Sequence, residues 1–343
     1  MKINFKNFII NNIQVSTAFE GEVVDLLNVW FSTSKTVKIT TSGSTGIPKI
    51  LEIEKVKMKN SAKMTCDFLD LKEGNSALLC LPVAYISGKM MIVRAIERKM
   101  ILKIVDPSKK PLINLEEKMD LCAMTPLQVE NSLDKIHFIK NLIIGGAQVS
   151  ENLKKKIAIA LNAKNSYCKI FESYGMSETL SHIALKEIYP NENQYFSTLD
   201  DIKISIDERN CLKIEAPQLN AEILQTNDVV EILDEKHFKF LGRTDFIINS
   251  GGAKIHPEKL ELFLKSQLLN FGIENELIIT SKNDEVLGEK LVLIIEGKQD
   301  EDIINKINSI PFEKNFHKPK EIFFKKEFPR TGNGKILRRD ILK

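Results

Sequence analysis

The sequence lacks the features that mark several classes of protein. Its 343 residues include five cysteines and one tryptophan. An odd number of widely spaced cysteines, mostly in apolar surroundings, favours reduced core residues over disulfides or a metal site. Basic and acidic residues nearly balance, at 49 against 46, so charge gives no reason to expect a nucleic-acid or membrane partner.

Long apolar runs are also missing. No stretch is as long as a membrane-spanning helix, and Asn11 and Asn12 stand where a signal peptide would still be apolar. The histidines are scattered without the spacing of metal ligands, which favours structural or surface roles. We therefore expect a cytoplasmic protein.

The length and the pattern of elements predict two domains. Hydrophobic residues make up 43% and charged residues 28% of the chain, as in soluble globular proteins. Strand-like and helix-like stretches alternate up to about residue 200, which indicates parallel βαβ units. Short alternating strands follow and indicate an antiparallel sheet or barrel. We place a large domain at 1–244 and a small α+β domain at 245–343.

A loop rich in glycine and hydroxyl residues lies between two strand-like runs, 36–40 and 50–53. Its glycines permit positive φ, and its amides, hydroxyls and one ammonium group would converge on a phosphate. It is not a P-loop, because Lys49 follows Pro48 and leads into a strand instead of a helix. The alternative is a flexible surface turn. The candidate phosphate ligands are Thr41, Ser42, Gly43, Ser44, Thr45, Gly46 and Lys49.

Further polar loops follow predicted strands. A loop over 81–89 precedes a predicted helix over 90–98, and Gly145-Gly146-Ala147 follows a strand over 141–144. The segment from Tyr174 to Thr179 follows a predicted strand over 169–173. Ligands bind at the carboxyl ends of parallel strands, so a nucleotide is expected across these loops.

Two more signatures lie near the C-terminus. Residues 242–258 contain Arg243 and Asp245, followed by Gly251-Gly252. Residues 329–335 form a turn with two glycines that presents Lys335. Together with the loops above, and in this order along nearly the whole chain, these segments resemble the adenylate-forming superfamily of acyl-CoA synthetases, adenylation domains and luciferases.

The resemblance implies a fold and a reaction. The fold is α/β, with a large N-terminal domain of mixed βαβ layers and a small barrel-like sheet, followed by a small mobile α+β domain. In the reaction a carboxylate attacks the α-phosphate of ATP, giving an acyl-adenylate and pyrophosphate, and a thiol then displaces AMP. The expected small molecules are a carboxylic acid, ATP, Mg²⁺ and coenzyme A.

The resemblance also assigns roles to single residues. Lys335 matches the catalytic lysine, whose charge would stabilise the transition state. Glu178 matches the ligand of Mg²⁺, and Ser177 a hydroxyl that touches the α-phosphate. Asp245 matches the hinge of the small domain. The remaining matches are Gly145, Gly146, Ala147, Ser173, Tyr174 and Gly175 around adenine, Asp228 and Arg243 at the ribose, and Gly251 and Gly252 in a loop that serves the thiol step.

The chain departs from this pattern in two places. About forty residues precede the phosphate loop, so the N-terminal layer of the family is reduced. Asn227 stands where a glycine commonly precedes Asp228. Neither departure removes a residue that would bind the nucleotide.

Residues 81–94 and the reduced size look most like the o-succinylbenzoate–CoA ligases of menaquinone biosynthesis. These relatives share the pattern L-P-x-x-x-x-S-G with an arginine six residues after the glycine. Tyr85 stands where they usually have histidine. A substrate with a second carboxylate needs a cation in the pocket, and we expect Tyr85, Ser87, Lys89 and Arg94 to line it.

Other interpretations stay open from the sequence. Lys89 and Arg94 could lie on a helix surface. The enzyme could be another small acyl- or aryl-CoA ligase, or one that loads a carrier protein. A different class is a non-catalytic nucleotide-binding module. The retained Lys335, Glu178, Asp228 and Arg243 argue against that class.

Overall fold

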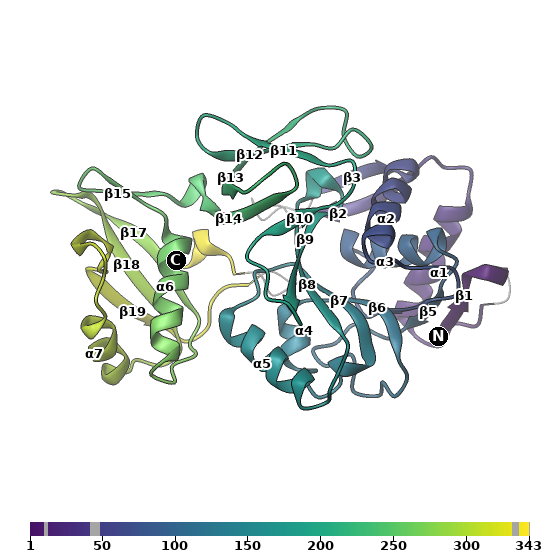
Figure 1. Cartoon of the computed structure of the whole chain (residues 1–343), viewed down its shortest axis with the longest axis horizontal. Helices are drawn as coiled ribbons and strands as arrows, with labels where there is room; N and C mark the ends of the chain where they lie inside the picture. The colour runs from purple at the N-terminus through teal and green to yellow at the C-terminus, as the bar shows by residue number, and fades with distance from the viewer. Residues whose placement is uncertain (10–12, 42–48, 331–335, 343) are drawn as a thin grey trace. The chain divides into compact units, whose positions relative to one another are not determined.

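The chain forms two compact units in its computed structural model, which describes residues 1–9, 13–41, 49–330 and 336–342 (Figure 1). Unit 1 holds Met1–Lys203 and Ile214–Leu224, and unit 2 holds Ile204–Lys213 and Gln225–Lys343. Unit 2 therefore includes strands that precede residue 245. The domain division at 244/245 and the hinge at Asp245 stay predictions.

Unit 1 is built on a sheet whose strands lie in the order β1-β5-β4-β6-β7-β8-β9-β10. Neighbours from β5 to β8 run parallel, whereas β1, β9 and β10 pair antiparallel with their neighbours. The strands are β1 (Lys2–Asn4), β4 (Ser76–Leu79), β5 (Ile101–Ile104), β6 (Met119–Met124), β7 (Ile139–Ile144), β8 (Lys169–Gly175), β9 (His182–Tyr189) and β10 (Phe196–Thr198). The predicted parallel βαβ pattern is thus present.

Helices cover this sheet, as expected where parallel strands are buried on both faces. They are α1 (Ala18–Phe31), α2 (Lys55–Phe68), α3 (Ile86–Glu97), α4 (Pro126–Glu130) and α5 (Glu151–Asn162). Leu153, Ile157 and Leu161 recur every four residues and so share one face of α5. They lie in the same buried cluster as Leu142 and Ile144 of β7. A separate hairpin of β2 (Thr36–Thr41) and β3 (Lys49–Glu54) completes the unit.

Helix α3 begins four residues earlier than the predicted start at residue 90, so residues 86–89 are helical and not part of a loop. Gly88 explains how the helix can start there. A Cβ at this position would lie 2.3 Å from the Pro82 carbonyl oxygen. The first turn of α3 therefore packs directly on the backbone that follows β4.

We expect Gly88→Ala to lower the free energy of unfolding by about 3 kcal/mol, because the added methyl group meets backbone that cannot rotate away. Gly21→Ala in α1 is the control, since its Cβ would approach no atom beyond its chain neighbours more closely than 3.9 Å. That change should be neutral or stabilise by up to ~1 kcal/mol, because alanine favours a helix. Urea unfolding measures both variants, and an equal loss in the two would contradict the close packing of α3.

Unit 2 contains all or most of the residues of two sets of strands. Four strands lie in the order β14-β13-β12-β11: β11 (Lys203–Ile206), β12 (Cys211–Glu215), β13 (Leu224–Ile232) and β14 (His237–Arg243). The second sheet has the order β16-β15-β18-β17, and β19 pairs in parallel with β18. Its strands are β15 (Ile248–Ser250), β16 (Ala253–Ile255), β17 (Leu277–Asp284), β18 (Gly288–Glu296) and β19 (Glu321–Lys325).

The two faces of the second sheet are covered differently. Leu277 and Ile279 of β17 share a core cluster with residues of α6 (Pro257–Leu269) and α7 (Glu301–Ser309), which lie beside the sheet in Figure 1. Ile278 points to the other face, because side chains alternate along a strand. It clusters there with Phe328 and Ile341. The C-terminal segment of the chain therefore covers the face that the helices leave free.

All five cysteines are buried and free, as predicted. The Sγ atoms of Cys80, directly after β4, and Cys122 of β6 lie 3.8 Å apart. Within the described ranges, no helix has both the length and the apolar character needed to cross a membrane.

Candidate active site

The predicted nucleotide loops of unit 1 gather at the carboxyl edge of the parallel strands. The Gly145 amide donates to the Met124 carbonyl at the end of β6 (3.1 Å). The Ser173 hydroxyl donates to the Ile144 carbonyl at the end of β7 (3.0 Å). A Cβ on Gly145 would lie 2.6 Å from the Ser173 Oγ. The two predicted adenine segments are therefore in direct contact, and a side chain at Gly145 would displace the Ser173 hydroxyl from its present position.

The turn after β8 is held by one buried hydroxyl. Thr179 Oγ1 lies 3.0 Å from the Met176 amide and 2.8 Å from the Ser181 carbonyl. Ser177 and Glu178 lie in the 3₁₀ helix η4 (Ser177–Thr179) and are exposed. The turn thus presents a hydroxyl and a carboxylate at the edge where the strands end.

The predicted phosphate loop joins two strands of a hairpin, as expected. Thr41 of β2 pairs with Lys49 of β3, and this is the last pair before the loop. Residues 42–48 lie outside the described residues, so the predicted roles of Ser42, Gly43, Ser44, Thr45 and Gly46 stay predictions. The side chains of Thr41 and Lys49 are likewise not described.

Arg94 is a charged side chain that is almost completely buried in unit 1. It lies on α3 and is only 2% exposed. Its Nη2 donates to the Ser181 hydroxyl (2.9 Å), its Nη1 faces the Met91 sulfur (3.8 Å), and its buried Nε has no partner among the described residues. Burial lowers the pKa of Arg94 to about 10, so the guanidinium is charged at neutral pH. No described carboxylate pairs with it.

A neutral histidine lies near Arg94. The Thr65 hydroxyl donates to the Ser61 carbonyl (3.1 Å) and therefore accepts from His182 Nε2, which is 3.0 Å away. Burial lowers the pKa of His182 well below its ordinary value, and the charge of Arg94 lowers it further. Arg94 is then the charged member of this pair at neutral pH. No pattern in the sequence predicts Ser181, Thr65 or His182 beside Arg94, because these contacts join α2, α3 and the start of β9.

The other predicted acid-pocket residues lie apart from Arg94. The ammonium group of Lys89 donates to the Val83 carbonyl, and burial lowers the pKa of Lys89. Five residues along a helix correspond to a rotation of about 140°, so Lys89 and Arg94 occupy different faces of α3. Ser87 is exposed and Tyr85 is half-buried just before α3 begins. The structure therefore does not bring the two predicted cations together.

The predicted ribose pair of unit 2 does come together. Asp228 of β13 and Arg243 of β14 are register partners, and Arg243 Nη1 lies 2.8 Å from Asp228 Oδ1. Asp228 is 5% exposed. The same guanidinium bonds Asp245 through Nη2 (2.6 Å). Asn227, which replaces the usual glycine, donates from Nδ2 to Asp245 Oδ1 (2.8 Å). The ribose pair and the predicted hinge residue thus belong to one hydrogen-bonded network.

The two remaining predicted elements lie elsewhere in the C-terminal part. Gly251 and Gly252 form the turn between β15 and β16, with φ of +55° and +81°. Glycine adopts such angles without strain. Lys335 lies outside the described residues, and its catalytic role stays a prediction.

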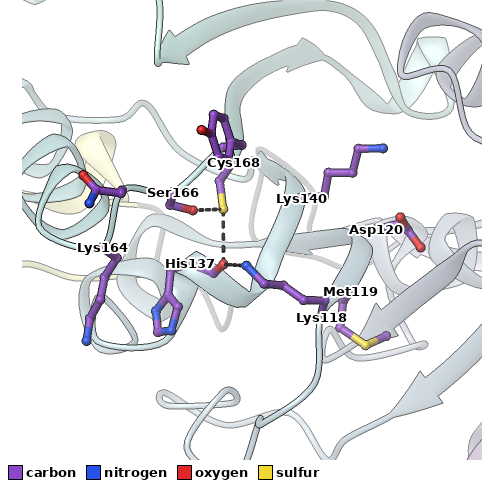
Figure 2. A pocket seen from close by; sticks show the side chains of 10 residues that line it. Lys118, Met119, Asp120, His137, Lys140, Lys164, Ser166 and Cys168 are labelled. Atoms are coloured by element: carbon purple, nitrogen blue, oxygen red, sulfur yellow. Dashed lines mark hydrogen bonds between the residues drawn. The ribbon is translucent and has the colours of Figure 1, made fainter.

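A separate cavity of about 320 Å³ lies at the opposite edge of the unit 1 sheet, beside the amino ends of β6, β7 and β8 (Figure 2). Figure 2 shows the Lys118 ammonium turned toward the His137 carbonyl, at 3.0 Å, while those of Lys140 and Lys164 point away from it. The predicted ligand loops are at the carboxyl ends of the strands. This cavity is therefore not part of the candidate active site.

Sequence comparison finds distant curated relatives, although no family model matches the chain. The 2-succinylbenzoate–CoA ligase of Lactococcus lactis is 23% identical over 329 residues, which cover 89% of this chain and 70% of that protein. The ligase of the same name from Listeria monocytogenes is 26% identical over 349 residues, covering 92% of this chain and 71% of that protein.

Solved structures extend the comparison. The o-succinylbenzoate coenzyme A synthetase of Bacillus subtilis, in complex with ATP and magnesium ion, matches with a TM-score of 0.73 at 19% identity, covering 89% of this chain and 69% of that one. An acyl-CoA synthetase (AMP-forming)/AMP-acid ligase II-like protein from Dyadobacter fermentans matches with a TM-score of 0.66 at 31% identity, covering 100% of this chain and 98% of that one. These matches confirm the predicted adenylate-forming fold. At this identity over nearly the whole of both chains, the protein belongs to the family of AMP-forming acyl-CoA synthetases.

Proposed function

We propose that this protein is an ATP-dependent acid–CoA ligase whose acid is o-succinylbenzoate. The observation that carries the choice of acid is the buried guanidinium of Arg94, which has no carboxylate partner among the described residues. The names of the curated relatives from L. lactis and L. monocytogenes agree with this choice.

The argument for a second carboxylate rests on desolvation. Transfer of a guanidinium from water into the protein interior costs several kcal/mol, and an anion in contact with it offsets part of that cost. Ser181 Oγ already bonds one nitrogen of Arg94 and can donate its own proton to a carboxylate. One carboxylate of the substrate would be activated, and the other would be held by Arg94 and Ser181.

The chemistry of the first step needs charge stabilisation more than proton transfer. A carboxylate oxygen attacks the α-phosphorus of ATP, the bond to the bridging oxygen breaks, and pyrophosphate leaves with the electron pair. Lys335 would neutralise charge on the oxygens in the transition state. Ser177 would donate to the α-phosphate, and the loop over 41–49 would hold the β- and γ-phosphates with its amides.

The residues present fit a magnesium ion and a ribose. Glu178 is exposed, and no described residue forms a hydrogen bond or ion pair with it, which suits a carboxylate that shares Mg²⁺ with phosphate oxygens. When bound, Mg²⁺ would offset the charge of the phosphates. Asp228 Oδ1 is oriented by Arg243, so that its carboxylate can accept from ribose hydroxyls.

The second step would use a different arrangement of the C-terminal residues. The thiolate of coenzyme A attacks the acyl carbon, and AMP leaves with the electrons of the acyl–phosphate bond. Rotation about Asp245 would withdraw Lys335 and bring in the turn of Gly251 and Gly252, a conformational gate between the two steps.

The test is the formation of AMP and a CoA thioester by the purified protein with a panel of acids. The panel holds o-succinylbenzoate, benzoate, cinnamate and medium-chain fatty acids. The proposal expects a thioester with o-succinylbenzoate and little with the others. Turnover with a different acid would keep the reaction and overturn the substrate. Acyl transfer to a carrier protein but not to CoA would overturn the acceptor.

A further inference from the structure

Both ends of the segment that carries Lys335 are anchored to unit 2. Arg330 and Ile336 form an antiparallel bridge, and the Leu337 amide donates to the Pro329 carbonyl (2.8 Å). The described residues on either side of 331–335 are therefore bonded to each other. Each of these two ends is also held by an ion pair.

The end that precedes residue 331 is held by a bidentate ion pair. Arg330 Nη1 and Nη2 lie 2.5 Å and 2.6 Å from Glu296 Oε1 and Oε2 at the end of β18. The Phe328 amide also donates to Glu296 Oε1 (2.6 Å). Burial would raise the pKa of Glu296, but the bonds from Arg330 and the Phe328 amide outweigh it and lower the pKa overall.

The second end is held by a more deeply buried pair. Arg338, in the 3₁₀ helix η7 (Arg338–Asp340), bonds Glu261 of α6 through Nη2. The other Glu261 oxygen accepts from the Ile279 amide (2.7 Å). The Arg338 guanidinium also lies over the Phe246 ring, 5.2 Å from its centre. Phe246 follows Asp245 directly in the 3₁₀ helix η5 (Thr244–Phe246).

We propose that Arg338 and Glu261 are positioning residues for Lys335. They hold the chain three residues after Lys335 and tie it to the turn that contains Asp245. The proposal rests on the proposed function, in which Lys335 serves the adenylation step. Neither residue needs to touch the substrate, because each acts through the backbone that follows the lysine.

The two ion pairs, Arg330–Glu296 and Arg338–Glu261, are called clamps below, and they respond differently to pH. Burial raises the pKa of Glu261 to about 7, against the opposing effects of Arg338 and the Ile279 amide. The other charged groups that face Glu261 are Glu258, which raises its pKa further, and Lys265, which lowers it. Glu258 is itself half-buried, and its buried Oε2 has no hydrogen-bond partner among the described residues. Protonation of Glu261 would remove the ion pair with Arg338, whereas Glu296 would stay ionised.

The protonation of Glu261 should affect the adenylation rate and the folding stability in opposite directions. A carboxyl group whose pKa is higher in the folded state binds protons more tightly there than in the unfolded chain. Its contribution therefore favours folding more strongly as the pH falls through 7 toward the unfolded value of about 4.3. The Arg338 clamp weakens over the same range. We expect the adenylation rate to fall below pH 7 without a loss of stability from Glu261.

The experiment compares Glu261→Gln with wild type and with Glu296→Gln as the matched control. The readout is the acid-dependent exchange of pyrophosphate into ATP between pH 6 and 8.5. At pH 8, Glu261→Gln should lower kcat by about 10- to 100-fold, the range expected for a displaced catalytic group. KM for ATP and the acid should not change, because the lost interaction acts in the transition state. The decline near pH 7 should be absent.

The Glu296→Gln control and a hydrogen-exchange measurement distinguish failure of the positioning role from failure of the proposed function. Glu296→Gln should lower kcat at every pH and keep the decline near pH 7. Hydrogen exchange of residues 336–342 should accelerate in Glu261→Gln, because Arg338 is no longer held and the bond from the Leu337 amide to the Pro329 carbonyl opens more often. This readout does not depend on turnover. An unchanged kcat with an unchanged pH profile in Glu261→Gln would overturn the clamp. Absence of exchange activity in wild type at any pH would overturn the proposed function instead.

Discussion

Lys335→Ala should lower the rate of adenylate formation by about 100- to 1,000-fold, the loss seen when one group that stabilises transition-state charge is removed. The expected cause is electrostatic, because the lysine would neutralise oxygens whose charge grows during attack on the α-phosphorus. The measurement is the acid-dependent exchange of pyrophosphate into ATP. KM for ATP should change little, since the phosphate loop and the ribose pair of Asp228 and Arg243 remain.

Two controls isolate the first step. Lys326→Ala removes an exposed lysine shortly before this segment in the chain and should leave the rate unchanged. Transfer of the acyl group from a preformed adenylate to CoA should remain close to the wild-type rate in Lys335→Ala, because the second step is assigned to the turn of Gly251 and Gly252. Equal losses in both half-reactions would contradict this division of roles.

Arg94→Met should raise KM for o-succinylbenzoate by at least ~100-fold, because a buried pair loses about 3–5 kcal/mol when one partner is removed. KM for ATP should be unaffected. Methionine has a similar length and no charge, so the free energy of unfolding should stay the same or increase. Steady-state kinetics and urea unfolding of the same variant test these expectations together.

Lys89→Met is the matched control for Arg94→Met. Lys89 lies on the same helix, but its ammonium bonds the Val83 carbonyl and not the group around Arg94. We expect a much smaller change in KM for the acid. A larger effect for Lys89→Met than for Arg94→Met would move the second carboxylate to the other face of α3.

Substrate analogues give an independent check on Arg94. The acids 3-benzoylpropionate and 2-butyrylbenzoate each lack one of the two carboxylates of o-succinylbenzoate. The analogue that keeps the reactive carboxylate should be a poor substrate for wild type and should lose little further activity in Arg94→Met. An equally large loss with that analogue would show that Arg94 serves the fold or the nucleotide and not the second carboxylate.

The sequence was enough to predict the features that depend on local order. The glycine- and hydroxyl-rich loop falls between paired strands, as the runs around Thr41 and Lys49 indicated. The segments at Gly145 and Ser173 meet at one edge because parallel strands place their carboxyl ends together. The resemblance to the adenylate-forming superfamily followed from four such segments, which occur in the expected order along the chain.

Contacts between distant parts of the chain could not be predicted from local sequence patterns. Ser181 beside Arg94 and Thr65 beside His182 depend on how α2, α3 and β9 pack. The start of α3 at Ile86 depends on a glycine that lets the helix touch the backbone near Pro82.

The same limit applied to the C-terminal part of the chain. Asn227 replaces a glycine, and only the structure links its side chain to Asp245. The pair of Arg338 and Glu261 is separated by 77 residues. No local pattern in the sequence predicts either contact.

The most direct test of the account is the acid-dependent exchange of labelled pyrophosphate into ATP by the wild-type protein. Exchange reports the reversible formation of an acyl-adenylate and needs neither CoA nor any variant. The account predicts exchange with o-succinylbenzoate that stops when the acid is omitted. No exchange with o-succinylbenzoate or with any other acid of the panel would contradict the central claim that this protein activates a carboxylate with ATP.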